Sequence, residues 1–171
     1  GYGNRQFENT DSLFLKKRRV IDKGNTEVVA EYIKEMTGAD VFRIMPDKEY
    51  EKIQDYDELV ELTRIEHEND ERPTFNGKIN DIGKYDTIFI GSPIWWYTFP
   101  QVMYTFLDSY DLNGKTIIPF TTHEGSGLAD VVEVLRKYYP NATVAEGLAI
   151  RGRDAVKSKE KVVRWLEKTG F

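Results

Sequence analysis

The sequence predicts an α/β protein with a doubly wound parallel sheet and helices on both of its faces. Three observations carry this prediction. From residue 24 onward, helix-like and strand-like stretches alternate regularly, which is the pattern of parallel strands joined by crossover helices. The strand-like stretches 87–90 and 116–120 are short and uncharged, as expected of strands buried on both faces. Each of these two stretches leads into a loop of unusual composition, at the end of the strand where open α/β sheets bind ligands.

The first half of the alternation is a helix, a strand and a second helix. The first helix is expected over residues 24–37, because apolar side chains repeat there at helical spacing before Gly38 stops it. A strand follows over residues 41–44. Residues 55–68 indicate a surface helix with an acidic outer side, and residues 73–84 return to the sheet as an extended stretch with turn signals.

The second half adds a helix, the strand over residues 116–120, another helix, a last strand and a final helix. A helix is expected from Pro100, because a proline in the first turn loses no helical hydrogen bond. Residues 128–135 predict a further helix, and residues 143–150 predict the last strand. Asp154 is expected to cap the final helix, with Val156 on its buried side.

The alternation lacks a first strand ahead of residue 24. Residues 1–23 are irregular in pattern, and we interpret them as an N-terminal segment or insertion, followed by one α/β domain over residues 24–171. A short strand at residues 13–15 is the alternative, although the four basic residues that follow it would then have to be exposed.

The composition excludes several classes of site. The chain has no cysteine, so it can form no disulfide, thiolate nucleophile or cysteine-ligated metal, and two distant histidines leave little for zinc. A net charge of −5 argues against general nucleic-acid binding, and no apolar run approaches the length of a membrane span. No signal peptide is visible, so a cytoplasmic protein is expected. Any redox chemistry must come from a bound cofactor.

Three loops carry residues suited to a mononucleotide with a flat ring. The first opens a helix with a glycine, an amide and a hydroxyl, which suits a phosphate. The second offers aromatic faces for stacking, and the third combines small residues, a histidine and glycines whose N–H groups can donate to a heteroaromatic edge. The candidate binding residues are Gly24, Asn25 and Thr26; Ser92, Pro93, Ile94, Trp95, Trp96 and Tyr97; and Thr122, His123, Glu124, Gly125, Ser126 and Gly127.

Each loop also has a purely structural interpretation. Asn25 or Thr26 would then be a helix cap, the tryptophan loop would pack on its own core, and His123 would make a hydrogen bond that stabilises its loop rather than act as a catalytic acid. Hydrolase chemistry from Ser126 and His123 is disfavoured, because their spacing within one loop aims no base at the serine.

The motifs in these loops resemble those of a known family. From Gly24 to Gly152 the chain is similar to the flavodoxin-like superfamily, and specifically to bacterial flavodoxins marked by Gly-Asn-Thr, Ser-Pro-Ile-Trp-Trp and Thr-His-x-Gly-Ser-Gly. The resemblance implies a three-layer sandwich with a five-stranded parallel sheet in the order 2-1-3-4-5 and noncovalent FMN at the strand carboxyl ends. It implies that residues 24–26 hold the phosphate, residues 92–97 line one side of the isoalloxazine, and residues 122–127 meet its polar edge and other face.

The front of the chain departs from that family. There a hydrophobic first strand runs directly into Ser-x-x-Gly-Asn-Thr, whereas this chain has Arg18-Arg19-Val20-Ile21-Asp22-Lys23 before Gly24. Asp22 would repel a phosphate. The first strand of this chain is therefore absent or atypical.

These observations favour an FMN-dependent oxidoreductase or electron carrier, in which the flavin performs the redox chemistry and no side chain is a nucleophile. The expected partners are a redox protein that docks on the acidic surface or a small quinone-like substrate, with neither nucleic acid nor membrane. A homodimer could supply the missing strand by swapping. The alternative is a flavodoxin-like domain that has lost FMN binding and serves as a binding or structural module.

Overall fold

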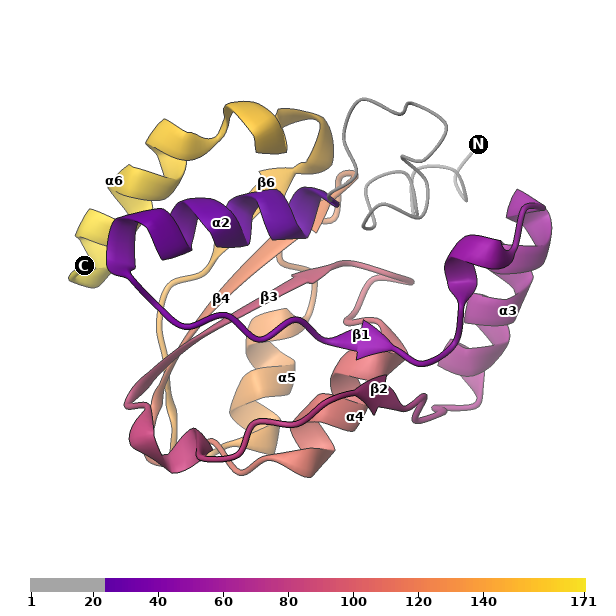
Figure 1. The fold of residues 1–171 in the computed structure, drawn as a ribbon, viewed down its shortest axis with the longest axis horizontal. Coiled ribbons are helices and arrows are strands. Elements are labelled where there is room, and N and C mark those ends of the chain that lie inside the picture. Colours follow the sequence, from indigo (N-terminus) through magenta and orange to yellow (C-terminus); the bar gives the residue numbers. More distant parts are fainter. Residues whose placement is uncertain (1–23) are drawn as a thin grey trace.

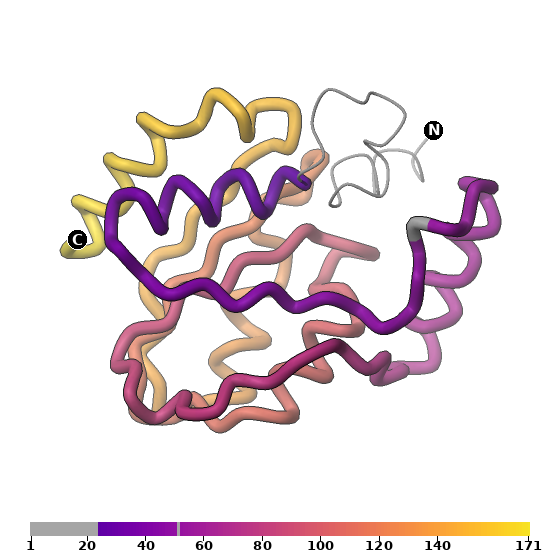
Figure 2. Tube along the Cα trace, viewed as in Figure 1, coloured from indigo at the N-terminus to yellow at the C-terminus, as the bar shows by residue number. Residues whose placement is uncertain are grey.

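The chain folds into a parallel sheet covered by helices on both faces (Figures 1 and 2). The structure is a computed structural model that describes residues 24–171. Helices α2 (Asn25–Thr37) and α6 (Lys159–Thr169) cover one face of the sheet, and α4 (Gln101–Ser109) and α5 (Val131–Tyr138) cover the other. The predicted α/β layering is confirmed. No helix within the described range is both long and apolar enough to cross a membrane.

The sheet is built around β4 (Thr116–His123). Strand β3 (Thr87–Pro93) pairs with β4 in parallel along its whole length, and β5 (Thr143–Val144) and β6 (Leu148–Arg151) pair with the other edge of β4. The described sheet thus has four strands, and the five-strand order stays a prediction.

The last strand, expected as one piece over residues 143–150, is interrupted. At the break, the main-chain carbonyl of Glu146 accepts a hydrogen bond from Trp165 Nε1 at 3.0 Å instead of joining the ladder. Gly147 follows, where an added Cβ would lie 3.0 Å from Leu128. The bend therefore serves the packing of α6 and of the loop before α5, which strand periodicity alone does not reveal.

Two apolar clusters hold the layers together. On the first face, Val29 and Ile33 of α2 meet Val162 and Trp165 of α6. On the other face, residues from α4 and α5 pack on the sheet around Ile117, which is fully buried. The burial follows the helical spacing of apolar residues in the sequence, because one stripe of each helix must leave water.

Residues 39–84 form an excursion from the sheet. Residues 39–44 are extended, and β1 (Met45–Pro46) then pairs antiparallel with β2 (Phe75–Asn76). Between them lie a 3₁₀ turn, η1 (Tyr50–Lys52), and α3 (Tyr56–Glu68), which Asp55 caps by accepting from the N–H of Asp57 at 2.9 Å. A second 3₁₀ turn, η2 (Ile82–Lys84), leads into β3. Figure 1 shows β1, β2 and α3 lying beside the parallel sheet.

The expected strand over residues 41–44 is wrong. This stretch pairs with no strand in the described part of the chain, and Val41 is 56% exposed. Its apolar residues do alternate as in a strand, but a paired strand also needs a neighbouring strand that can form backbone hydrogen bonds with it.

Some boundaries also differ from the expectations. Strands β3 and β4 extend to Pro93 and His123 rather than ending near residues 90 and 120, and Pro100 precedes α4 as its N-cap residue. Asp154 does not cap α6, because residues 152–157 form the 3₁₀ helix η3 (Gly152–Lys157) and α6 begins after Ser158.

Val156, expected to be buried, is 49% exposed. The neighbouring Ala155 fills the inward position of η3 and is fully buried. The expected division at residue 23 and the alternative strand at residues 13–15 lie outside the described residues.

Candidate functional site at the carboxyl edge of the sheet

The start of α2 meets the end of β4. Thr26 Oγ1 and Thr122 Oγ1 lie 2.7 Å apart and share a hydrogen bond, although 96 residues separate them in the chain. Gly24, and not Asn25 or Thr26, is the N-cap residue, with extended φ and ψ of −71° and 163°. The interpretation of Asn25 or Thr26 as a helix cap is therefore wrong. The first N–H groups of a 13-residue helix, which have no partner within it, point to this edge and favour an anion.

The end of β3 lies beside the end of β4. Ser92 pairs with Thr121, and Pro93 pairs with Thr122, in the parallel register. Ser92 is fully buried, and its hydroxyl donates to the carbonyl of Pro93 at 2.7 Å. The tryptophan loop and the glycine-rich loop thus begin side by side at the ends of β3 and β4. The hydrogen bond of Thr26 to Thr122 places the start of α2, the third predicted loop, beside them.

The tryptophan loop is a tight, strained turn. The N–H of Trp95 donates to the carbonyl of Thr98 at 2.9 Å, and the N–H of Thr98 donates back at 3.2 Å. Between them, Trp96 and Tyr97 have φ of 55° and 65°. This left-handed conformation costs a residue other than glycine about 1 kcal/mol each. Such strain persists where surrounding contacts impose it, and it gathers at ligand sites.

The three aromatic side chains of this loop have different surroundings. Trp95 is buried and packs edge to face on Tyr50, with ring centroids 5.9 Å apart. Trp96 donates from Nε1 to Thr63 Oγ1 of α3 at 3.2 Å, and Tyr97 is 53% exposed. The interpretation that this loop packs on the protein's own core therefore holds for Trp95. Tyr97 instead exposes its ring to solvent.

A buried carboxylate supports this turn and was not predicted from the sequence. Glu66 of α3 is 2% exposed, and its carboxylate accepts from Lys48 Nζ at 2.7 Å and from the Tyr50 hydroxyl at 2.9 Å. Burial, followed by the charge of Glu66, raises the pKa of Tyr50 well above its ordinary value. The available signal was that Glu66 falls on the apolar side of its helix, three residues after the buried Thr63.

The glycine-rich loop after β4 is folded back on the strand. Thr121 Oγ1 donates to the carbonyl of Gly127 at 2.9 Å, and the N–H of Gly125 donates to His123 Nδ1 at 2.9 Å. Neutral His123 therefore carries its proton on Nε2. Gly127 has φ of 62°, which favours glycine. The structure thus supports the interpretation of His123 as a residue that stabilises its loop.

Arg151 is a further residue that the sequence analysis missed. It ends β6 beside His123 in the register, and its Nη1 donates to the carbonyl of Glu124 at 2.8 Å. Burial first, and then the charges of Arg151 and Lys161, lower the pKa of His123 below its ordinary value. The available signal was position, because the third parallel strand must end at the same edge as the first two.

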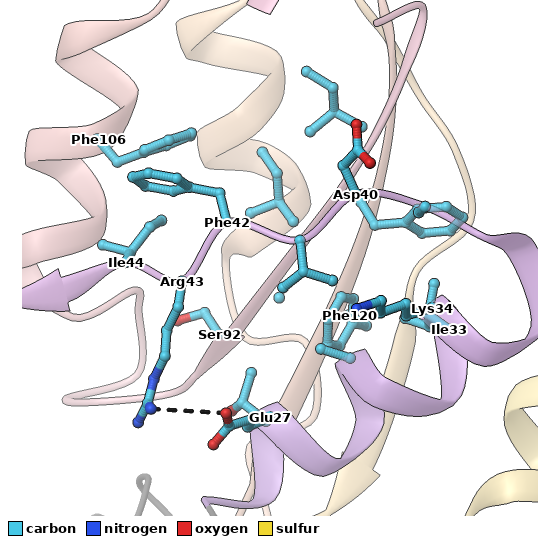
Figure 3. A pocket seen from close by; sticks show the side chains of 18 of the residues that line it. Glu27, Ile33, Lys34, Asp40, Phe42, Arg43, Ile44, Ser92, Phe106 and Phe120 are labelled. Atoms are coloured by element: carbon cyan, nitrogen blue, oxygen red, sulfur yellow. Dashed lines mark ion pairs between the residues drawn. The ribbon is translucent and has the colours of Figure 1, made fainter. Parts of the chain in front are cut away.

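An apolar cavity among residues 24–171 only borders this site (Figure 3). It has a volume of about 690 Å³, and it reaches the edge at Thr26, Ser92, Pro93 and Trp95, but none of the residues 122–127 lines it. The cavity is therefore a separate feature, and the candidate site is the open edge formed by the three loops.

Comparisons with known proteins agree with this geometry. The Flavodoxin_4 family model, described as flavodoxin, matches residues 20–169. A candidate flavoprotein from Bacteroides eggerthii is 30% identical, with a TM-score of 0.74, over 87% of this chain and 92% of that chain. A second from Bacteroides uniformis is also 30% identical, with a TM-score of 0.72, over 83% and 90%.

A flavoprotein from Lactobacillus acidophilus, solved in complex with FMN, is 20% identical with a TM-score of 0.59, over 77% of this chain and 89% of that chain. No curated protein matches the chain. The family match spans most of the sequence and coincides with the observed α/β layering and the three loops at one edge, so the chain belongs to the flavodoxin family.

Proposed function

We propose that this protein binds FMN noncovalently at the carboxyl edge of β3 and β4, and that it acts in electron transfer or as a small oxidoreductase. The observation that carries the proposal is the Thr26–Thr122 hydrogen bond, because it joins the anion-favouring start of α2 to the polar loop. Bound FMN would supply the exchange of electrons. The protein's own residues would bind and orient it.

The chemistry of the residues fits such a group. The first turn of α2 and the hydroxyl of Thr26 would hold the phosphate. Glu27 also lies in that turn, but its carboxylate faces Arg43 at 3.7 Å, which offsets its repulsion of an anion. The strained aromatic turn would present a ring face to the isoalloxazine, and the backbone N–H groups of the glycine-rich loop would meet its polar edge.

Two of the similar proteins are candidate flavoproteins and a third was solved with FMN, which supports a flavin in this fold. The third shares too little sequence to transfer its contacts, so the FMN assignment rests on the donor set of this chain. That set includes an anion site, which riboflavin would leave unused.

The electron-carrier role is supported by the position of α3. This helix carries four exposed carboxylates and one arginine, and it contacts the tryptophan turn through Thr63. An acidic helix beside the ring site suits a basic redox protein, because complementary charge speeds encounter. A quinone-like substrate would instead need open space over the ring beside Tyr97.

The first test is a titration of the purified chain with FMN and with riboflavin, followed by quenching of flavin and tryptophan fluorescence. Thr26→Val is expected to weaken FMN about tenfold, or about 1.4 kcal/mol, while riboflavin is unchanged. Thr37→Val, at the far end of the same helix, is the matched control and should leave both affinities unchanged. Equal loss of both flavins in Thr26→Val would contradict a phosphate role for Thr26.

The three tryptophans allow the ring site to be located. Trp165 lies on α6, bonded to the carbonyl of Glu146, so Trp165→Phe should retain the quenching. Trp96→Phe should remove most of it. If FMN and the folded chain quench neither each other's flavin nor tryptophan fluorescence, the alternative is favoured, namely a flavodoxin-like module that has lost FMN binding.

A further inference from the structure

Arg151 lies at the end of β6, the third strand that reaches the carboxyl edge. In the parallel register it pairs with His123, so the two side chains leave the sheet on the same face and next to each other. Arg151 is partly buried, and its Nη1 donates to the main-chain carbonyl of Glu124 at 2.8 Å. A side chain from β6 thus reaches the loop that follows β4.

Arg151 and His123 bind the same peptide group of the glycine-rich loop. The carbonyl of the peptide between Glu124 and Gly125 accepts from Arg151, and its N–H donates to His123 Nδ1 at 2.9 Å. The guanidinium also lies beside Gly125, where an added Cβ would be 3.8 Å from Nη1. Because both polar atoms of this peptide have partners, its orientation is fixed.

The next two N–H groups of the loop are left for a ligand. Within residues 24–171, the N–H groups of Ser126 and Gly127 donate to no protein atom, although both residues are partly buried. In the proposed complex these donors would meet the polar edge of the flavin ring. Because β3 and β6 pair with opposite edges of β4, Arg151 approaches the loop from the side away from the tryptophan turn. Arg151 therefore lies behind the loop, as seen from the proposed ring site.

The positive charge of Arg151 has no acid beside it. No carboxylate within residues 24–171 forms an ion pair with its guanidinium, and the partner of Nη1 is a carbonyl oxygen. The charge acts on the loop, because burial first, and then Arg151 and Lys161, lower the pKa of His123. An arginine stays protonated at any physiological pH, so this end of the site carries a permanent positive charge.

The two redox states of a flavin respond differently to such a charge. Reduction of a flavin adds two electrons and one proton, which goes to N5, and leaves a negative charge over N1 and O2 at the polar edge of the ring. A positive charge near that edge therefore favours the reduced state over the uncharged oxidised ring. We propose that Arg151 is a positioning residue of the flavin site, which orients the glycine-rich loop and, through its charge, raises the reduction potential of bound FMN. This inference rests on the FMN site proposed above.

The test compares the 171-residue chain with three variants. Arg151→Gln removes the charge but keeps a donor for the carbonyl of Glu124, whereas Arg151→Lys keeps the charge. Lys168→Gln is the matched control, because it removes one positive charge in the last turn of α6, where Lys168 pairs with Glu146 at 3.2 Å. Fluorescence quenching gives the affinity for oxidised FMN. Anaerobic titration with dithionite against a reference dye, which supplies the electrons, gives the midpoint potential of bound FMN.

The expected result separates charge from shape. Arg151→Gln should weaken the binding of reduced FMN about tenfold relative to oxidised FMN, because one charge near the ring is lost. For a two-electron couple, this change corresponds to a midpoint potential lower by about 30 mV. Arg151→Lys and Lys168→Gln should both retain the potential of the unchanged chain.

Three outcomes overturn the inference, and only one of them also removes the proposed function. If Arg151→Gln binds FMN and has the potential of the unchanged chain, the charge does not act on the ring. If Arg151→Lys lowers the potential as much as Arg151→Gln does, the shape of the guanidinium sets the potential and its charge does not. If the unchanged, folded chain binds no FMN, the proposed function and this inference fail together.

Discussion

Replacing Glu66 by Gln tests whether the buried carboxylate holds the aromatic turn in place. Glu66 joins Lys48 and Tyr50, and the ring of Tyr50 packs on Trp95. Glutamine keeps the volume of the side chain but loses the charge, and it turns one of the two acceptor oxygens into a donor. That donor would face either the Lys48 ammonium or the Tyr50 hydroxyl.

The expected cost follows from the contacts. Hydrogen bonds to a charged group contribute about 1.5–3 kcal/mol. The Lys48 side chain is 43% exposed, so solvent screens its attraction to Glu66 and the lower part of that range applies. We expect Glu66→Gln to lower the free energy of unfolding by about 2 kcal/mol, and Tm by about 4–8 °C for a chain of this size.

The assay is thermal unfolding followed by circular dichroism, with tryptophan emission recorded below the transition. Glu61→Gln on the same helix is the matched control, because Glu61 pairs with Arg64 on the exposed side, and it should lower Tm much less than Glu66→Gln does. Equal Tm values for the two variants would contradict this role of Glu66. A Glu66→Gln chain with a lowered Tm but an unchanged tryptophan emission below the transition would contradict it as well.

Three further outcomes are expected. Because burial and then the charge of Glu66 raise the pKa of Tyr50 in the folded state, the free energy of unfolding should fall as the pH rises above about 10, and denaturant melts should show a shallower fall for Tyr50→Phe. Because the pKa of His123 is lowered in the folded state, the contribution of neutral His123 to stability should be present above about pH 6.5 and lost as the pH falls below that value. An NMR titration of Arg151→Gln should show a higher pKa for His123. An unchanged pKa would contradict an effect of the Arg151 charge on His123. Gly127→Ala should lower the free energy of unfolding by about 1 kcal/mol, because Gly127 has a positive φ. Gly83→Ala should lower it less in the same melts, because φ of Gly83 is not positive and the added Cβ would make an ordinary contact at 3.6 Å.

Local signals in the sequence predicted much of the fold. Gly38 was expected to stop the first helix, and it adopts φ of 72° directly after α2. The acidic helix over residues 55–68 appears as α3 with Asp55 as its cap. These elements are predictable because their caps and apolar stripes depend on residues a few positions apart.

The missed features depend on residues far apart in the sequence. Asp154 has the chemistry of a cap, but it lies in the 3₁₀ helix η3 beside the fully buried Ala155, and α6 begins only at Lys159. Residues 41–44 have strand periodicity but pair with no strand within residues 24–171.

The same limit applies at the candidate site. The three loops were identified by composition, and their convergence at one edge followed from the expected parallel topology. The strain at Trp96 and Tyr97 and the support from Glu66 arise from tertiary contacts that no local pattern encodes.

The hydrogen bond between Thr26 and Thr122 sets how these two hydroxyl groups would share their hydrogens around the proposed phosphate. Each hydroxyl has one hydrogen to donate and two lone pairs that can accept. Thr26 would therefore donate to an anion at the start of α2 while it accepts from Thr122. In the proposed complex, that arrangement would fix the orientation of the Thr122 hydroxyl at the point where the glycine-rich loop begins.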